Sequence, residues 1–515
     1  MKTALIAGTA LVALAAHSLP AAAFCGFYVS GSGEKMFNDA TEVVLMRDGT
    51  RTVLSMQNDY KGPLDDFAMV VPVPVVLHEK DVKTLPKTVF AHTDSLGAPR
   101  LVEYWERDPC YVEQPMPTTM RSAGMPAPMG GADGDMSKKG SVKIEAQFNV
   151  AEYKILILSA TDSAGLERWL NDNHYKIPPG AEPLLRPYVE GGSKFFVAKV
   201  DPKKVQVQDG HAALSPIRFH YDSDEFVLPI RLGMANSSGK QDLIVNVLSP
   251  DKRYEVANYK NVFIPTNFDV KPVVKTRFAE FYAALFDKTL ETHPGAVVTE
   301  YAWTAVPNYH CDPCTDADIS NPDLMTLGGD VVGGRIAAGN FVLTRLHARY
   351  GKGDMKDDLR FREAVPMTGG REDWVGTGVE YGAKPSSQNF FQARYAIRHA
   401  WTGPVACAHP VRNRWGGPPD GDAQQTIAAG KLAFAPRGQL SLPGVVKRDL
   451  PEIRVRKDGA AGPGPSPSPS PGPGPSGNPK FATPPGTKLQ GFGFGALLGM
   501  SLLAGGALIR RRRTR

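Results

Sequence analysis

Short stretches in which apolar and polar residues alternate run through most of the chain, and this period of two predicts β-strands. The clearest pair, residues 42–47 and 50–56, flanks the dipeptide Asp48-Gly49. Because this dipeptide is typical of a type I′ turn, which needs positive φ at both central residues, we predict a β-hairpin there. Further strands are expected at 67–76, 101–105, 153–159, 193–200, 226–232, 243–248, 253–256, 297–303, 341–348 and 392–399.

Apolar residues at helical spacing are confined to a few segments. They predict helices at 162–173 and at 277–290, the second capped by Thr276, and a partly helical region at 82–96. A loop rich in Pro, Gly and Met, without periodicity, covers residues 114–141. The pattern therefore predicts an α+β fold with many strands and few helices.

The second half of the chain repeats short motifs of the first half in the same order. Asp-Val-Lys, a Glu-Tyr pair and Asp-Pro-Cys occur within 81–110 and again within 269–314. We therefore divide this region into two β-rich α+β domains, 24–210 and 211–457. The spacings of the motifs differ, so either the domains are similar units from a duplication or the recurrence is chance.

The N-terminus has the pattern of a secretory signal peptide. Lys2 precedes an apolar stretch over 4–16, and Ala21-Ala22-Ala23 forms a small-residue cleavage site. We expect residues 1–23 to be removed during export.

The C-terminus predicts a membrane anchor. Residues 458–490 are rich in Pro, Ser and Gly, a composition typical of an extended stalk. The nineteen residues 491–509 carry no charge, close to the ~20 needed to cross a bilayer. The arginines of 510–515 predict a cytoplasmic tail. Together the two termini predict an exported single-pass membrane protein, with its ectodomain in the periplasm or at the cell surface.

Three glycines of the anchor share one helix face, because Gly491, Gly495 and Gly499 are four residues apart. Such spacing lets two transmembrane helices pack closely, which predicts a homodimer. The alternative is an anchor only, since glycine is frequent throughout this segment.

Charge excludes one class of partner. The 59 basic and 53 acidic residues of the 515 give a net charge of +6, and Lys2 and the tail arginines account for all of it. The ectodomain is therefore neutral overall, and we expect no nucleic-acid partner. The partners we expect are the membrane and an envelope protein.

Cysteine is the residue type with the clearest chemistry. Exported proteins form disulfides, and Cys25 and Cys110 bracket the first domain, so we predict that they pair. We also predict that Cys407 pairs with Cys311 or Cys314, which leaves one of the 5 cysteines without a partner.

Two other interpretations of the cysteines remain open. Cys311 and Cys314 form a C-x-x-C motif, which suits redox cycling or half of a metal site. His310 would serve as a third ligand beside Cys311 and Cys314, or Cys407 and His409 would complete a Cys₃His zinc set with them. Asp316, Asp318, Asn321 and Asp323 form an oxygen-rich candidate for Ca²⁺. The sequence has no nucleophile elbow, phosphate-binding loop or H-E-x-x-H motif, so we expect neither catalysis nor a cofactor.

Several segments resemble the bacterial family called domain of unknown function 2330. They are Phe24-Cys-Gly-Phe-Tyr-Val29, the hairpin 44–57, Phe67-Ala-Met-Val-Val-Pro-Val-Pro74, Cys311-Asp-Pro-Cys-Thr315, 341–350 and Arg412-Asn-Arg-Trp-Gly-Gly-Pro-Pro419. The resemblance implies an exported protein and no particular activity. We therefore expect a non-catalytic binding or structural module of the envelope; the alternative is an envelope thiol oxidoreductase or metal-dependent enzyme that uses Cys311 and Cys314.

Overall fold

The computed structural model describes residues 27–30, 37–61, 67–111, 142–175, 177, 181–208, 211–236, 239–305, 319–351, 353–370, 382–419, 426–428 and 436–459. The chain up to Gly462 forms one compact unit, and Pro463 begins another. Several predictions lie outside the described residues: the signal peptide 1–23, the loop 114–141, the stalk, the anchor 491–509 with Gly491, Gly495 and Gly499, the tail 510–515, and Cys25, His310, Cys311, Cys314, Asp316 and Asp318.

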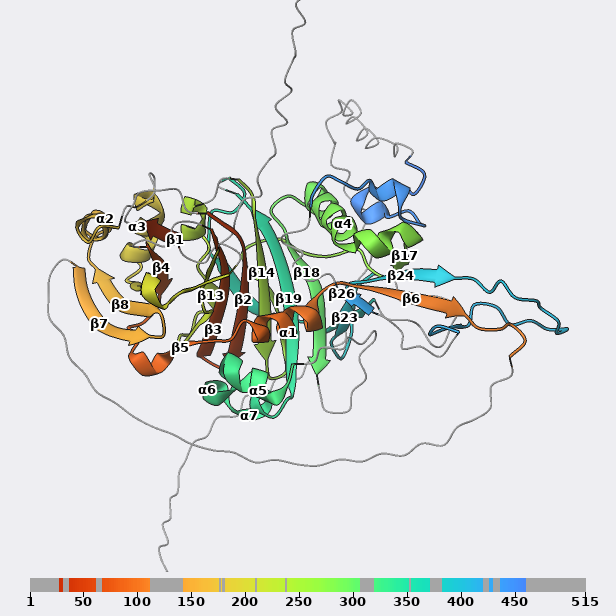
Figure 1. The fold of residues 1–515 in the computed structure, drawn as a ribbon, viewed down its shortest axis with the longest axis horizontal. Coiled ribbons are helices and arrows are strands. Elements are labelled where there is room, and N and C mark those ends of the chain that lie inside the picture. The colour runs from red at the N-terminus through yellow and green to blue at the C-terminus, as the bar shows by residue number, and fades with distance from the viewer. Residues whose placement is uncertain are drawn as a thin grey trace, which may run out of the picture. The chain divides into compact units, whose positions relative to one another are not determined.

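An 11-stranded sheet, here called the central sheet, runs through the described part of the first unit (Figure 1). In spatial order it contains β22 (Lys384–Pro385), β21 (Met367–Gly369), β23 (Phe390–Gln392), β18 (Val297–Ala305), β19 (Phe341–Tyr350), β14 (Gln241–Ser249), β2 (Phe37–Asp48), β3 (Arg51–Lys61), β12 (Ile217–Asp222) and β5 (Val82–Thr84), with β16 (Asn261–Phe263) beside β18.

The central sheet joins the two halves of the chain. β14 runs parallel to β2, and β12 is antiparallel to both β3 and β5. Strands from before and after residue 210 therefore share one sheet, which corrects the predicted division into domains 24–210 and 211–457. The sequence pattern indicated where strands lie but not which strands pair.

The predicted β-hairpin is confirmed, with its turn shifted by one residue. Asp48 pairs with Arg51, so the two turn residues are Gly49 and Thr50 rather than Asp48 and Gly49. Of these two, Gly49 has a positive φ, at 56°. This arrangement matches a type II′ turn, in which only the first central residue needs positive φ.

A second sheet packs face to face against the central sheet. It contains β1 (Phe27–Ser30), β4 (Phe67–Val73), β9 (Lys194–Val200), β8 (Tyr153–Ala160) and β7 (Val142–Val150), in that order and all antiparallel. Val71 and Ile157 of this sheet belong to one buried core with Val43 and Val245 of the central sheet. The two sheets thus bury the alternating apolar residues that predicted them.

Helices α2 (Ser163–Asp172) and α3 (Glu182–Glu190) cover the outer face of the second sheet, where Leu166 and Leu185 are buried. α2 confirms the helix predicted at 162–173. Asp162 caps it by accepting a hydrogen bond from the Gly165 N–H.

Helices α1 (Thr88–Gly97) and α4 (Phe278–Thr292) lie on the other face of the central sheet. α4 confirms the predicted helix, but Thr276 does not cap it. Thr276 lies in the short helical turn Pro272–Arg277, and its hydroxyl donates to the Val273 carbonyl. This turn leads into α4, so the cap position falls later than the sequence suggested.

A third sheet forms the feature that we call the arm. β6 (Arg100–Glu106) and β24 (Arg394–His399) run parallel to each other and away from the central sheet (Figure 1). The remaining strands of this sheet are β17 (Phe268–Asp269), β25 (Trp415–Gly416) and β26 (Thr426–Ala428).

Short elements complete the described part of the chain. They are β10 (Gln206–Gln208), β11 (His211–Ala213), β13 (Val227–Leu228), β15 (Arg253–Val256), β20 (Leu359–Ala364), α5 (Asn321–Leu324), α6 (Asp330–Val332) and α7 (Gly334–Ala337). The strand-rich α+β class is confirmed. Among the described residues, no helix has the length and apolar content that a membrane crossing requires.

Candidate functional site

Charged side chains are buried between the central sheet and helices α1 and α4. Glu300 of β18 accepts a hydrogen bond from Arg345 Nε at 2.8 Å, and its other oxygen lies 2.7 Å from His347 Nδ1. Asp242 of β14 lies 3.0 Å from His347 Nε2. All four residues are almost completely buried. We call this group, with the side chains bonded to it, the ionic network.

The ionic network holds His347 in its charged form. A carboxylate faces each ring nitrogen, so both nitrogens donate and the ring is an imidazolium. Burial alone would lower the pKa of His347, but Glu300 and Asp242 raise that pKa above its usual value. Burial would likewise raise the pKa of Glu300, but His347 and Arg345 lower it to about 2.

Further residues attach the ionic network to its cover. Tyr282 of α4 donates to Glu300 at 2.7 Å, and Arg345 Nη1 lies 2.6 Å from the Asp94 carboxylate of α1. Phe286 of α4 stacks on His347 with 3.8 Å between ring centroids. These contacts hold α1 and α4 on the sheet. Because Glu300, Arg345 and His347 have almost no exposed surface, they can fix the fold but cannot touch a substrate.

Glu42 of β2 differs from Glu300 in the direction of its pKa shift. It accepts a hydrogen bond from Asn246 Nδ2 at 3.0 Å. Part of the side chain reaches the surface, yet burial of the carboxyl, followed by the nearby Asp94 carboxylate, raises its pKa well above the usual range. These surroundings therefore favour the protonated form of Glu42, whereas they favour the ionised form of Glu300.

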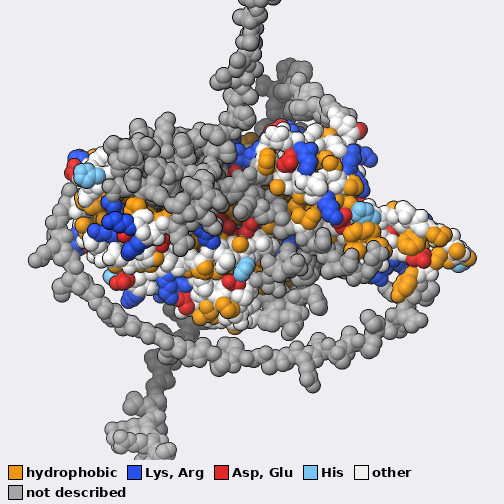
Figure 2. Space-filling view, viewed as in Figure 1, with side chains coloured by type: hydrophobic (Ala, Val, Ile, Leu, Met, Phe, Trp, Pro, Cys, Tyr) orange, Lys and Arg blue, Asp and Glu red, His pale blue; other side chains and the backbone are white. Residues whose placement is uncertain are grey.

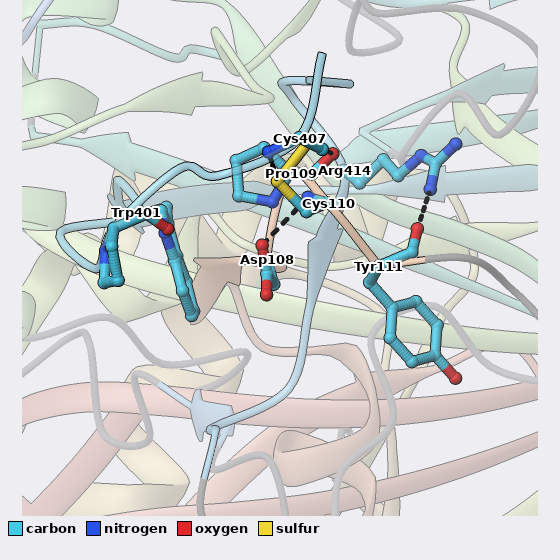
Figure 3. The surroundings of a disulfide bond; sticks show 8 residues. Asp108, Pro109, Cys110, Tyr111, Trp401, Cys407 and Arg414 are labelled. Atoms are coloured by element: carbon cyan, nitrogen blue, oxygen red, sulfur yellow. Dashed lines mark hydrogen bonds between the residues drawn. A yellow bond between two sulfur atoms is a disulfide. The ribbon is translucent and has the colours of Figure 1, made fainter. Parts of the chain in front are cut away.

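The accessible candidate site is the end of the arm. A disulfide joins Cys110, which follows β6, to Cys407, which follows β24, across 297 positions of sequence (Figure 3). The Cys407 N–H points to Cys110 Sγ at 3.1 Å, and the Val411 N–H donates to the Pro109 carbonyl at 2.9 Å. The disulfide thus ties together the two loops, which we call the tip (residues 107–111 and 400–414).

Glu106, the last residue of β6, fixes both ends of the longer tip loop. One carboxylate oxygen accepts from the Trp401 N–H at 2.9 Å, and the other accepts from the Asn413 N–H at 2.9 Å. Arg412 lies 3.3 Å from the same carboxylate. Burial would raise the pKa of Glu106, but the bonds from Asn413, Trp401 and Arg412 lower it.

Large apolar side chains of the tip face solvent. Tyr111 is 52% exposed, Val411 44% and Val405 38%. Tyr111 and Trp401 lie on either side of the disulfide in the view of Figure 3. Arg414 Nη1 donates to the Tyr111 carbonyl at 3.0 Å, and so holds the short loop in place. The tip is therefore an exposed apolar surface on two loops that a disulfide and hydrogen bonds hold in place.

The disulfide corrects two predictions. Cys110 pairs with Cys407, so the predicted Cys25–Cys110 bond and the predicted bond from Cys407 to Cys311 or Cys314 are wrong. The physical reason is that β6 and β24 are parallel neighbours, which brings together residues that the sequence separates widely. Membership of Cys110 and Cys407 in a disulfide is confirmed.

The predicted metal ligands that the structure describes do not form a site. Cys407 is disulfide-bonded and cannot bind zinc as a thiolate, and His409 is exposed. Ser320 caps α5, and Asp323 completes the capping box by accepting bonds from the Ser320 N–H and hydroxyl; Asp323 also lies 3.0 Å from His92 Nδ1. Among the described residues, no three His, Cys, Asp or Glu side chains are grouped to hold a metal ion.

The ionic network was not predicted from the sequence. Strand 341–348 was predicted, but Arg345 and His347 within it, and Arg349 directly after it, were not singled out. The sequence does contain a signal for this network. Basic residues share one face of the strand, and acidic residues lie inside strand 297–303 and directly before strand 243–248. Glu106 and the apolar loop 400–411 were also missed.

The chain folds into a strand-rich protein whose arm is closed by a disulfide. It belongs to a known bacterial family. The model of that family, described as "Uncharacterized protein conserved in bacteria (DUF2330)", matches residues 19–362. This confirms the resemblance seen in the sequence. The match includes β6 and Cys110 but ends before β24 and Cys407. Comparisons with curated proteins and with solved structures found no match to the chain.

Proposed function

We propose that this protein is an exported, membrane-anchored binding module of the cell envelope, and that the tip is its binding surface. One observation carries the proposal: Tyr111, Val405 and Val411 are exposed together on loops that a disulfide and Glu106 hold rigid. A rigid apolar surface binds at lower entropic cost than a mobile loop, because its side chains are already ordered.

Export is supported by the disulfide and by the sequence at both ends. Disulfides persist outside the cytoplasm and are rare inside it. The signal peptide 1–23 and the anchor 491–509 fit the same placement. Protease added to spheroplasts should remove the ectodomain and spare a tag placed after Arg515. Protection of the ectodomain would contradict this topology.

The anchor is proposed to be a dimer contact as well as a tether, through Gly491, Gly495 and Gly499. Gly495→Ile with Gly499→Ile should abolish association in a membrane two-hybrid assay while insertion stays normal. An unchanged signal would leave the segment as an anchor only.

The binding function is tested with the ectodomain, residues 24–462. Its buried cores all belong to the unit that ends at Gly462, so we expect it to fold without the stalk and anchor. The ectodomain should sediment with envelope fragments of the parent bacterium, and Val405→Asp with Val411→Asp should abolish this. Equal sedimentation of the two proteins, or none by the wild type, would refute the tip as a binding surface.

A further inference from the structure

The longer loop of the tip has a composition unusual for a solvent-exposed loop. Residues 400–411 contain no Asp, Glu, Lys or Arg. Val405 and Val411 are exposed, and two prolines, three alanines and one cysteine accompany them. Figure 2 shows apolar side chains gathered at the end of the arm. An exposed loop that avoids charge in this way is suited to an apolar environment.

Part of the backbone of this loop forms internal hydrogen bonds or lacks an N–H group. Pro404 and Pro410 have no N–H group to satisfy. The N–H groups of Trp401, Cys407 and Val411 bond to groups of the shorter loop or of β6. Internal bonds of this kind matter most where water is absent, because an unsatisfied N–H in hydrocarbon is costly.

Basic side chains lie directly behind the apolar end. Arg107 and Arg412 are exposed and Arg414 is half-buried, against one half-buried acid in the tip, Asp108. Glu106 is buried and pairs with Arg412 at 3.3 Å, so counting it gives three arginines against two acids at the tip. The surface behind the apolar end is therefore net positive, which complements the negative headgroups of anionic lipids.

Tyr111 completes the pattern. Its ring is half exposed, and its phenol group gives it an apolar body with a polar end. Side chains of this kind are enriched where hydrocarbon meets water. Exposed valines, an amphipathic aromatic residue and arginines therefore lie together on the tip, a combination found in segments that lie in a membrane interface.

From this geometry we propose that the tip docks on an anionic lipid bilayer, with Val405 and Val411 entering the interface and Arg107, Arg412 and Arg414 contacting lipid phosphates. This inference rests on the proposed function, because it names the class of partner that the tip binds. The combination of exposed apolar side chains with neighbouring arginines matches the surface of an anionic bilayer, which offers hydrocarbon and phosphate together.

The test is co-sedimentation of residues 24–462 with vesicles of 30% phosphatidylglycerol in phosphatidylcholine and with vesicles of phosphatidylcholine alone. The wild type should bind the anionic vesicles more tightly, and added salt should weaken this binding. Val405→Asp with Val411→Asp should reduce binding at least about tenfold, because it moves charge into the apolar interface. Arg107→Gln should reduce binding to the anionic vesicles about fivefold and leave binding to neutral vesicles unchanged.

Val365→Asp is the matched control, because Val365 is 65% exposed in the turn after β20, away from the arm. It should bind as the wild type does. Each variant is first checked for native circular dichroism and for an intact Cys110–Cys407 bond by peptide mapping. A tip variant that binds anionic vesicles as tightly as the wild type would overturn the inference.

The two proposals fail in different ways. If the wild type ignores both kinds of vesicle but still sediments with envelope fragments through the tip, the partner is a protein and only the lipid inference is wrong. If it binds neither vesicles nor envelope fragments, the binding function itself is refuted.

Discussion

Replacing Glu300 with glutamine tests the charge state of the ionic network. Glutamine has almost the same shape as glutamate, so the change leaves packing intact and removes one negative charge. Its amide group would also turn N–H donors toward Arg345 or His347, which are donors themselves. The substitution therefore leaves two buried cations with less compensation, while Asp94 and Asp242 remain on their outer sides.

The expected cost is large because the site is closed to water. Removing one member of a buried ion pair typically costs about 3–5 kcal/mol, since the remaining charge stays buried. With an m value of about 3 kcal/mol/M, at the top of the range for small proteins, the urea midpoint should fall by about 1–1.7 M. The measurement is urea unfolding of residues 24–462 at pH 6, followed by circular dichroism.

Glu42→Gln is the matched control, because Glu42 lies near the charges of Asp94 and Arg345 and its raised pKa favours the neutral form. Glutamine mimics a protonated carboxyl, so this change should cost less than about 1 kcal/mol. Glu300 has a pKa of about 2 against a usual value near 4.5, so its contribution is complete above pH 4.5 and is lost as the pH falls toward 2. The difference between wild type and Glu300→Gln should shrink over that range. Equal costs for the two substitutions, or a cost below about 1 kcal/mol for Glu300→Gln, would refute the assignment of charges.

Three further predictions concern His347 and the tip. The stabilising effect of His347 should be complete below pH 6.5 and be lost as the pH rises through its raised pKa. The difference in the free energy of unfolding between wild type and His347→Gln should therefore shrink at alkaline pH. A constant difference from pH 5 to 10 would contradict this. Cys110→Ser with Cys407→Ser should lower the free energy of unfolding by about 2–4 kcal/mol in urea titrations, and an unchanged midpoint would show that the bond does not constrain the unfolded chain. Glu106→Ala should speed amide exchange across 401–413 and weaken the tip locally by about 1–3 kcal/mol, because it leaves two N–H groups without their acceptor; unchanged protection would refute that role.

Local features of the fold could be predicted from the sequence. The hairpin at Gly49 and helices α2 and α4 depend on turn chemistry and on the spacing of apolar residues, which a short window contains. Pro72 is instructive, because β4 lies between two other strands rather than at an edge. Phe27, the first described residue of its partner β1, lies opposite Val70, so Pro72 lies two residues beyond the pairing that the structure describes.

Pairings between distant segments could not be predicted in this way. The Cys110–Cys407 bond depends on β6 lying beside β24, and the ionic network depends on β14, β18 and β19 being neighbours. The alternation of polar and apolar residues was also misleading about which strand faces are buried. Arg345 and His347 alternate with apolar residues, a pattern that usually indicates a face exposed to water. Here α4 covers that face, so buried acids replace water as the partners of the basic side chains.

The ionic network and the tip are connected through the root of the arm. The Ala393 N–H donates to the Glu300 carbonyl at 2.9 Å, and the Arg100 N–H donates to the Ala393 carbonyl at 2.9 Å. Both strands of the arm therefore start beside Glu300, the residue whose side chain organises the network. Asp94 of α1, six residues before Arg100, is held by Arg345. Buried charges fix direction better than apolar contacts, because their hydrogen bonds allow few alternative geometries. We therefore infer that the network sets the direction in which the arm leaves the sheet, while the disulfide and Glu106 set the shape of its end.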